Sequence, residues 1–224
     1  EQISQILAET GAGRVNLLGH SQGGIDARYA AAVMPEWIAS VTTIGSPNQG
    51  SAVADWVLKN APKDSLAGKS LILNGQILAA AIAVFGDGGA QGENDQVGAV
   101  EELSTEGMRQ FNQLYPQGLP TTECGEGPEE VNYVRYYSWG GTMPITNLMD
   151  VSDIMLGLNA LTQKGPSDGV VGRCSSHLGK VLRDDYPYNH FDLVNQLSGL
   201  KALHAPEPRE VFMEHARRLG AKGL

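Results

Sequence analysis

The sequence predicts an α/β fold, with a mostly parallel sheet and helices on both of its faces. Three observations support this prediction: a short apolar strand at 14–18, an alanine-rich helical segment at 22–34, and a β-rich segment at 37–44 that ends at a Ser-Pro pair. A strand, a helix and a strand in such close succession form a right-handed crossover, which places the two strands side by side and parallel.

The chain opens on an amphipathic segment in which Ile3, Ile6 and Leu7 share one helical face, followed by a turn at 11–13 that contains two glycines. The first residues include no Met and do not form a signal peptide. We therefore expect a chain that starts inside a longer protein, so that the N-terminal strands of the sheet are absent from it.

Later segments complete the predicted fold. Residues 66–85 are strongly apolar but too interrupted for a bilayer-spanning helix, and 86–98 are rich in Gly, Asp and Gln, as in a surface loop. This stretch, about 64–98, is interpreted either as a helical lid or cap or as an ordinary core helix with a loop. The remaining pattern predicts helices at 104–115, 151–161 and 208–219 and a strand at 131–139, with Ile154, Met155 and Leu158 facing inward.

Composition limits the function classes. A chain of 224 residues with 42% apolar residues can bury a full core, so residues 1–224 are expected to form one domain. The net charge is -9 and the Lys and Arg residues are scattered, which argues against nucleic acid as a partner.

Ser21 is the candidate nucleophile. It lies at the centre of the segment 19–23, Gly-His-Ser-Gln-Gly, which follows the predicted strand and opens the predicted helix. A sharp turn at this point exposes the serine hydroxyl at the sheet edge, and glycines at 19 and 23 leave room for the adjoining strand and helix. The alternative is a serine that only caps the helix.

A serine hydroxyl needs a histidine to take its proton and a carboxylate to orient that histidine. Of the five histidines, His20 is too close to the turn, and two lie in or near the C-terminal helix. His190, in a loop-like segment, is favoured over His177. For the acid, Asp168 in a Ser-Asp-Gly turn is favoured, while Asp150 and Asp153 remain competitors.

The two cysteines, Cys124 and Cys174, are fifty positions apart and have no zinc-site spacing. Composition alone fits either one disulfide bond in an exported protein or two unrelated buried thiols.

Several longer segments resemble the secreted bacterial triacylglycerol lipases of the Pseudomonas and Burkholderia type, which are foldase-dependent α/β-hydrolases. The resemblance spans nearly the whole chain and rests on these segments: 15–21 (Val-Asn-Leu-Leu-Gly-His-Ser), 44–47 (Ile-Gly-Ser-Pro), 119–127 (Leu-Pro-Thr-Thr-Glu-Cys-Gly-Glu-Gly), 136–139 (Tyr-Tyr-Ser-Trp), 168–179 (Asp-Gly-Val-Val-Gly-Arg-Cys-Ser-Ser-His-Leu-Gly), 183–186 (Arg-Asp-Asp-Tyr) and 189–196 (Asn-His-Phe-Asp-Leu-Val-Asn-Gln).

The resemblance implies a triacylglycerol lipase that acts through an acyl-enzyme intermediate, with Ser21, Asp168 and His190 as the triad and His177 in a structural role. It also implies a Cys124–Cys174 disulfide, a lid that opens at an oil-water interface, secretion through the periplasm and a membrane-anchored foldase chaperone as a partner. One structural Ca²⁺ ion is implied as well. The matching ligand positions are Asp150, Asp192, Gln196 and Leu200, with Asp153 as a competitor for Asp150.

The oxyanion hole requires two backbone N–H donors. Gln22, directly after the nucleophile, supplies one, and we expect the second to come from a loop that precedes this sequence. There are two alternatives to a lipase. One is a short-chain esterase or phospholipase with the same triad, and the other is an inactive fragment that lacks half of its oxyanion hole. A comparison of emulsified long-chain with soluble short-chain esters distinguishes a lipase from the esterase or phospholipase.

Overall fold

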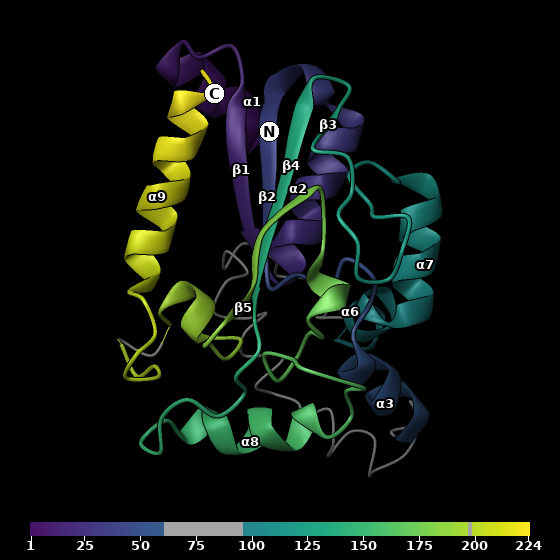
Figure 1. Cartoon of the computed structure of the whole chain (residues 1–224). Coiled ribbons are helices and arrows are strands. Elements are labelled where there is room, and N and C mark those ends of the chain that lie inside the picture. The colour runs from purple at the N-terminus through teal and green to yellow at the C-terminus, as the bar shows by residue number, and fades with distance from the viewer. Residues whose placement is uncertain (61–95, 197–198) are drawn as a thin grey trace.

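The computed structural model of the chain describes residues 1–60, 96–196 and 199–224 (Figure 1). A mostly parallel sheet lies at its centre. Strand β2 pairs in parallel with β1 and β4, β4 pairs in parallel with β5, and the short β3 runs antiparallel to β4. The strands are β1 (Val15–His20), β2 (Ile38–Ile44), β3 (Glu130–Val131), β4 (Val134–Gly141) and β5 (Lys180–Tyr186).

The helices lie on both faces of this sheet, as predicted. Across the described ranges, none of them is both long enough and apolar enough to cross a membrane. The α-helices are α1 (Gln2–Thr10), α2 (Gln22–Val33), α3 (Ala52–Asn60), α6 (Gln96–Leu103), α7 (Thr105–Leu114), α8 (Val151–Ala160) and α9 (Pro208–Ala221).

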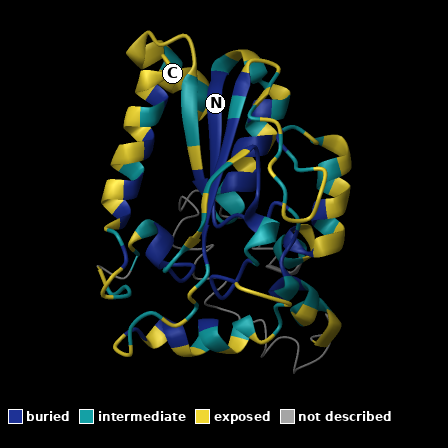
Figure 2. Cartoon of the chain, in the orientation of Figure 1, coloured by how far each residue is buried: buried dark blue, intermediate teal, exposed yellow. Residues whose placement is uncertain are grey.

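Strand β2 is the core of the fold, because every one of its residues is buried (Figure 2). Successive side chains of a strand point to opposite faces of the sheet. Val41 packs in one cluster with Ala27 and Ala31 of α2, whereas Ile44 packs with Val211 of α9 on the other face. The central strand is therefore covered on both sides, which explains its mostly apolar and β-branched sequence.

The predicted lid segment, 64–98, lies outside the described residues up to position 95. Its last three residues are described and contradict the predicted loop at 86–98, because Gln96 starts helix α6. Glycine at 98 did not prevent helix formation there. Helix α6 packs against α3 and α7, and such tertiary packing can outweigh a weak local propensity.

Helix α8 forms where expected but in the opposite orientation. Ile154 is 72% exposed and Leu158 is 61% exposed, so the prediction that these residues face inward was wrong. The buried side of α8 carries Asp153 and Leu156 instead. Asp153 accepts backbone hydrogen bonds from the segment before the helix, and these contacts orient the helix with its polar residue inward.

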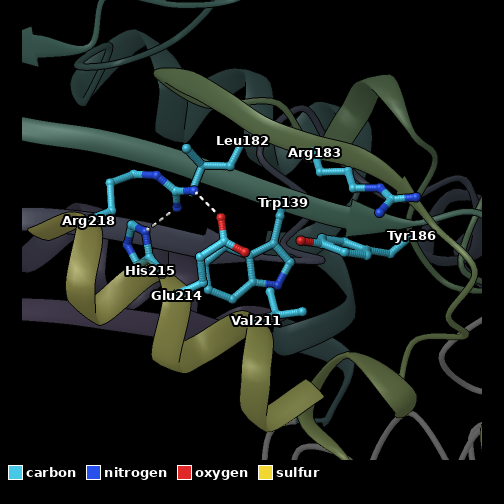
Figure 3. A pocket seen from close by; sticks show the side chains of 8 residues that line it. All are labelled: Trp139, Leu182, Arg183, Tyr186, Val211, Glu214, His215 and Arg218. Atoms are coloured by element: carbon cyan, nitrogen blue, oxygen red, sulfur yellow. Dashed lines mark hydrogen bonds and ion pairs between the residues drawn. The ribbon is translucent and has the colours of Figure 1, made fainter. Parts of the chain in front are cut away.

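His215 anchors α9 to the sheet (Figure 3). Arg218 donates a hydrogen bond to Nδ1 of His215 (3.2 Å), so the ring proton is on Nε2, which donates to the Thr42 hydroxyl (2.8 Å). The ring also makes edge contacts with Tyr137 and Trp139. Burial first, and then the charge of Arg218, lower the pKa of His215 to about 4.

This lowered pKa predicts a loss of stability in acid. Above pH 6.5 His215 is neutral in both the folded and the unfolded chain, and its contribution is fully present. As the pH falls from 6.5 to 4, the unfolded chain binds the proton first, so the free energy of unfolding decreases. In urea unfolding, wild type should be more stable than H215Q by about 1 to 2 kcal/mol at pH 8, and this advantage should shrink and then reverse as the pH falls toward 4.

The control for this experiment is H204Q, because His204 is exposed. It should follow the wild-type curve throughout. A difference between wild type and H215Q that stays constant with pH would contradict the role assigned to His215.

Candidate functional site

Ser21 lies on a strained turn between β1 and α2. Its backbone has φ 54° and ψ −127°, a conformation that non-glycine residues rarely adopt. Ser21 occupies the N-cap position of α2, yet its side chain makes no capping hydrogen bond. The hydroxyl instead lies 3.0 Å from Nε2 of His190. The alternative of a helix-capping serine is therefore excluded by the geometry.

Close packing of β1 against α2 holds this turn. A Cβ atom at Gly19 would lie 2.2 Å from the carbonyl oxygen of Gly23, and one at Gly24 would lie 2.1 Å from the hydroxyl of Ser46. At Gly23 itself a Cβ would meet nothing within 4 Å among the atoms described. The prediction that Gly23 provides the required room was therefore wrong. Gly24, which sequence reasoning missed, has that role.

His190 and Asp168 form a buried pair beside Ser21. Nδ1 of His190 lies 2.8 Å from Oδ2 of Asp168, and both side chains are almost fully buried. The other carboxylate oxygen of Asp168 accepts the backbone N–H groups of Val170 (2.9 Å) and Val171 (2.7 Å). The backbone N–H of His190 also donates to the carbonyl of Asp168. The carboxylate is thus fixed in one orientation, with one oxygen directed at the imidazole.

Gly45 packs closely against the His190–Asp168 pair. It has φ +52°, and a Cβ there would lie 2.6 Å from Leu193 and 3.1 Å from the Asp168 carboxylate. Only glycine fits this close approach without displacing the acid. No local sequence pattern singles out Gly45 for this role, because it lies in an ordinary turn after a strand.

The predicted calcium ligands lie partly together. The buried carboxylates of Asp150 and Asp153 both accept hydrogen bonds from the Asn189 amide, at 3.4 and 2.7 Å, and Oδ2 of Asp192 accepts from the Asn189 backbone N–H at 3.2 Å. Burial, the main cause, and the charges of Asp153 and Asp150 together raise the pKa of Asp192 to about 6, against the lowering effect of hydrogen bonds from Asn189 and Thr146.

The segment that follows Asp192 contributes one unsatisfied polar group to this region. Among the described residues, the buried side-chain oxygen of Gln196 has no hydrogen-bond partner. Leu200, the fourth predicted ligand position, is half-buried. In the parts of the chain that the structure describes, no three His, Cys, Asp or Glu side chains are arranged to hold a metal ion; the predicted set contains only two carboxylates, the other two positions being backbone carbonyls.

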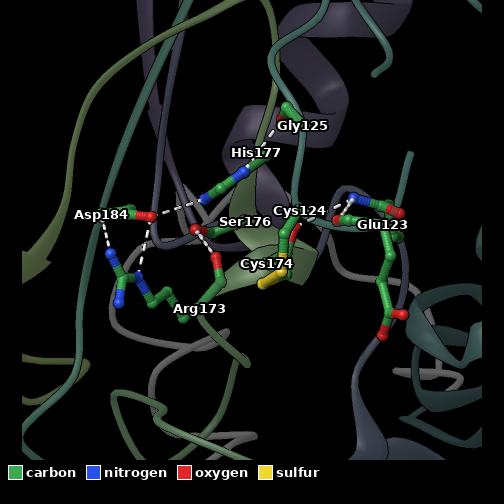
Figure 4. The surroundings of a disulfide bond; sticks show 9 residues. Glu123, Cys124, Gly125, Arg173, Cys174, Ser176, His177 and Asp184 are labelled. Carbon is green, nitrogen blue, oxygen red and sulfur yellow. Dashed lines mark hydrogen bonds and ion pairs between the residues drawn. A yellow bond between two sulfur atoms is a disulfide. The ribbon is translucent and has the colours of Figure 1, made fainter. Parts of the chain in front are cut away.

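A second Asp–His pair lies away from Ser21. Cys124 and Cys174 form a disulfide, and next to it His177 contacts Asp184 through Nε2 (3.0 Å) and the carbonyl of Gly125 through Nδ1 (3.0 Å) (Figure 4). A bidentate ion pair with Arg173, the main cause, lowers the pKa of Asp184. Both ring nitrogens of His177 are engaged by acceptors, which fits a structural residue.

His20, the residue before Ser21, contacts His190, the candidate catalytic histidine. Its Nε2 lies 2.9 Å from the carbonyl oxygen of His190, and the two rings are 4.6 Å apart at an angle of 44°. Burial, followed by the charge of His190, lowers the pKa of His20 well below its usual value. Sequence reasoning set His20 aside because it adjoins Ser21; the contact with His190 depends on tertiary structure.

Comparison with known proteins finds relatives that match the whole length of the chain. Residues 1–76 match the family model of the alpha/beta hydrolase fold. The chain is 46% identical over 223 residues to a triacylglycerol lipase of Vibrio cholerae and 39% identical over 233 residues to one of Pseudomonas fragi. Both matches cover 100% of this chain, and they cover 71% and 79% of those relatives.

Solved structures show the same fold at low sequence identity. The mature Bacillus licheniformis lipase BlEst2 has a TM-score of 0.56 at 20% identity, covering 88% of this chain and 66% of that one. A Staphylococcus hyicus lipase has a TM-score of 0.55 at 14% identity, covering 92% and 69%.

The packing at the turn predicts opposite outcomes for two alanine substitutions. G19A forces a Cβ into the backbone of α2 and should prevent folding or lower the unfolding temperature strongly, as expected of severe overpacking. G23A places its methyl group in open space within a helix, where alanine is favoured over glycine by about 1 kcal/mol. Soluble yield and thermal unfolding of both variants test this, and equal behaviour of the pair would contradict it.

Proposed function

Because the chain belongs to the bacterial triacylglycerol lipases of the α/β-hydrolase fold and is a serine ester hydrolase, we propose that it hydrolyses triacylglycerol esters with Ser21, His190 and Asp168 as its catalytic triad. The observation that carries this proposal is the continuous chain of contacts from Ser21 Oγ through His190 to Asp168, at 3.0 and 2.8 Å. These are hydrogen-bond distances suited to proton transfer.

In the first half of the reaction, the Oγ atom of Ser21 attacks the ester carbonyl carbon while Nε2 of His190 takes the hydroxyl proton. The carbonyl π bond breaks, and its electron pair moves onto the oxygen. His190 then gives its proton to the leaving alcohol as the ester C–O bond breaks, which leaves an acyl group on Ser21. Asp168 stabilises the imidazolium that forms twice in each cycle, because its Oδ2 is held at Nδ1.

In the second half, water attacks the acyl carbon and gives a proton to His190, which passes it to Ser21 as the fatty acid leaves. The backbone N–H of Gln22 stabilises the oxyanion in both halves. Gln22 is the first residue of α2, so its N–H is among the four that have no acceptor within the helix, and it lies at the positive end of the helix dipole.

The exposed side of α8 supports the proposal that the substrate is present as an apolar phase. Val151 is 84% exposed, Ile154 is 72% exposed and Leu158 is 61% exposed, and Leu148 and Leu161 flank them with exposures of 99% and 82%. Large apolar side chains grouped on one surface are unusual unless they contact another apolar surface. This favours a lipid aggregate over a soluble short-chain ester or a phospholipid monomer as the substrate form.

One structural Ca²⁺ ion is part of the proposal, with Asp150, Asp192 and the backbone carbonyls of Gln196 and Leu200 as ligands. The clustered, buried carboxylates fit a hard divalent cation, which would stabilise their charge. Asp150 fits better than Asp153: both oxygens of Asp153 accept hydrogen bonds of 2.6–2.7 Å, whereas within the described part of the chain Oδ2 of Asp150 has only a contact of 3.4 Å. When bound, the ion would hold the loop that carries His190.

Secretion and assistance by a foldase complete the proposal. The Cys124–Cys174 disulfide supports passage through an oxidising compartment, since such bonds rarely persist in the cytosol. A foldase partner rests on the family resemblance alone.

The two Asp–His pairs offer a matched test of the triad. D168N should lower kcat on the order of 10⁴-fold, because the histidine loses the group that fixes its tautomer and stabilises its cation. D184N removes the carboxylate beside His177 and should leave kcat within about threefold of wild type. Labelling of wild type by an organophosphonate, and its loss in S21A, identifies the nucleophile. Comparable losses in D168N and D184N would contradict the assignment.

The calcium site is tested by stability, independently of turnover. Adding Ca²⁺ at about 100 times its Kd should stabilise the wild-type protein by about 2.7 kcal/mol in thermal or urea unfolding. D192N should lose this gain, whereas D185N should keep it, because Asp185 is exposed and paired with Arg183. A gain of equal size in D192N would rule out the proposed ligand set.

A further inference from the structure

His20 and His190 form an imidazole pair beside the nucleophile. His20 is the last residue of β1, and Ser21 follows it on the strained turn. The same turn that exposes the serine hydroxyl therefore fixes where the His20 ring lies. Nε2 of His20 reaches the carbonyl oxygen of His190 at 2.9 Å across a sequence separation of 170 residues.

This contact defines the tautomer of His20. A carbonyl oxygen only accepts hydrogen bonds, so Nε2 of His20 must carry a proton and donate it. The bond fixes the backbone of His190 at the residue whose ring must stay between Ser21 and Asp168. The backbone N–H of His190 donates to the carbonyl of Asp168, so both peptide groups that flank the His190 Cα atom are held.

The neutral state of His20 matters for the neighbouring ring. With ring centroids 4.6 Å apart, a charged His20 would oppose each formation of the His190 imidazolium. Burial, mainly, and the charge of His190 favour the uncharged form of His20, and together they outweigh the opposite effect of its hydrogen bond to the His190 backbone. An uncharged donor can therefore hold His190 without competing for its positive charge.

We infer that His20 is a positioning residue for the ester hydrolysis: through its Nε2–H bond to the His190 carbonyl and its ring contact, it keeps the imidazole of His190 aligned between Ser21 and Asp168. This inference rests on the proposed triad. It assigns to the residue before the nucleophile a role distinct from that of the turn itself.

Three substitutions separate the hydrogen bond from ring packing. H20F keeps an aromatic ring but loses the donor, and should lower kcat about tenfold with KM unchanged, since one hydrogen bond contributes about 1 to 1.5 kcal/mol net. H20Q keeps an N–H donor at a similar reach and should restore kcat to within about threefold of wild type. H20N, whose amide is one carbon shorter, should resemble H20F and serves if H20F does not fold. The matched control is H204F, because His204 is exposed.

A loss of kcat in H20F or H20N that H20Q restores, at unchanged KM, supports the inference. Wild-type turnover in H20F overturns it. So does an equal loss in H20F, H20N and H20Q that follows their unfolding temperatures, because that result means His20 only fills space. Organophosphonate labelling of the wild-type protein tests the proposed function separately: absence of labelling contradicts the triad, whereas normal labelling with wild-type turnover in H20F contradicts only the role of His20.

Discussion

The backbone conformation of Ser21 is the constraint on which the rest of the site depends. A non-glycine residue at φ 54° and ψ −127° costs on the order of 1 to 3 kcal/mol and persists only where the surroundings determine it. Here the determining contact is the close approach of β1 and α2, at Gly19 and Gly24. The buried strand β2 supports that approach, because Ile44 accepts the backbone N–H of Ser21. Core packing therefore maintains a local strain that would otherwise relax.

The two Asp–His pairs consist of the same residue types in different surroundings. Asp184 already has a full cationic partner in Arg173, and both nitrogens of His177 face acceptors. His177 therefore has no nitrogen directed at a nucleophile. In the other pair, Asp168 is satisfied by backbone N–H groups and carries its charge toward His190 alone, whose second nitrogen faces the Ser21 hydroxyl. The residue types are the same, and the remaining hydrogen bonds decide what each pair can do.

Local patterns predicted the central part of the fold. The strand before Ser21, helix α2 and strand β2 all lie where predicted, because a buried parallel strand and a small-residue helix have distinct compositions. Strand β5 was missed, since its half-exposed, charged sequence resembles a loop. The orientation of α8 was also missed, because periodicity identifies an apolar face but not which surface covers it.

For the site, the sequence and the resemblance brought Ser21, Asp168 and His190 together. The roles of Gly24, Gly45 and Asn189 depend on contacts between distant segments.

Asn189 explains why the histidine loop is ordered although it belongs to no helix or strand. Its side-chain oxygen accepts the N–H groups of Phe191 and Asp192, both at 2.8 Å, and its amide nitrogen donates to Asp153 at 2.7 Å. The loop is thereby tied to the residues that precede and begin α8, and His190 is held between this anchor on one side and Asp168 on the other. The buried Asn189 amide, which donates to carboxylates and accepts from loop N–H groups, therefore connects the acidic cluster to His190. Neutralising charge in that cluster, by a cation or by a proton, would therefore act on the position of the His190 ring as well as on stability.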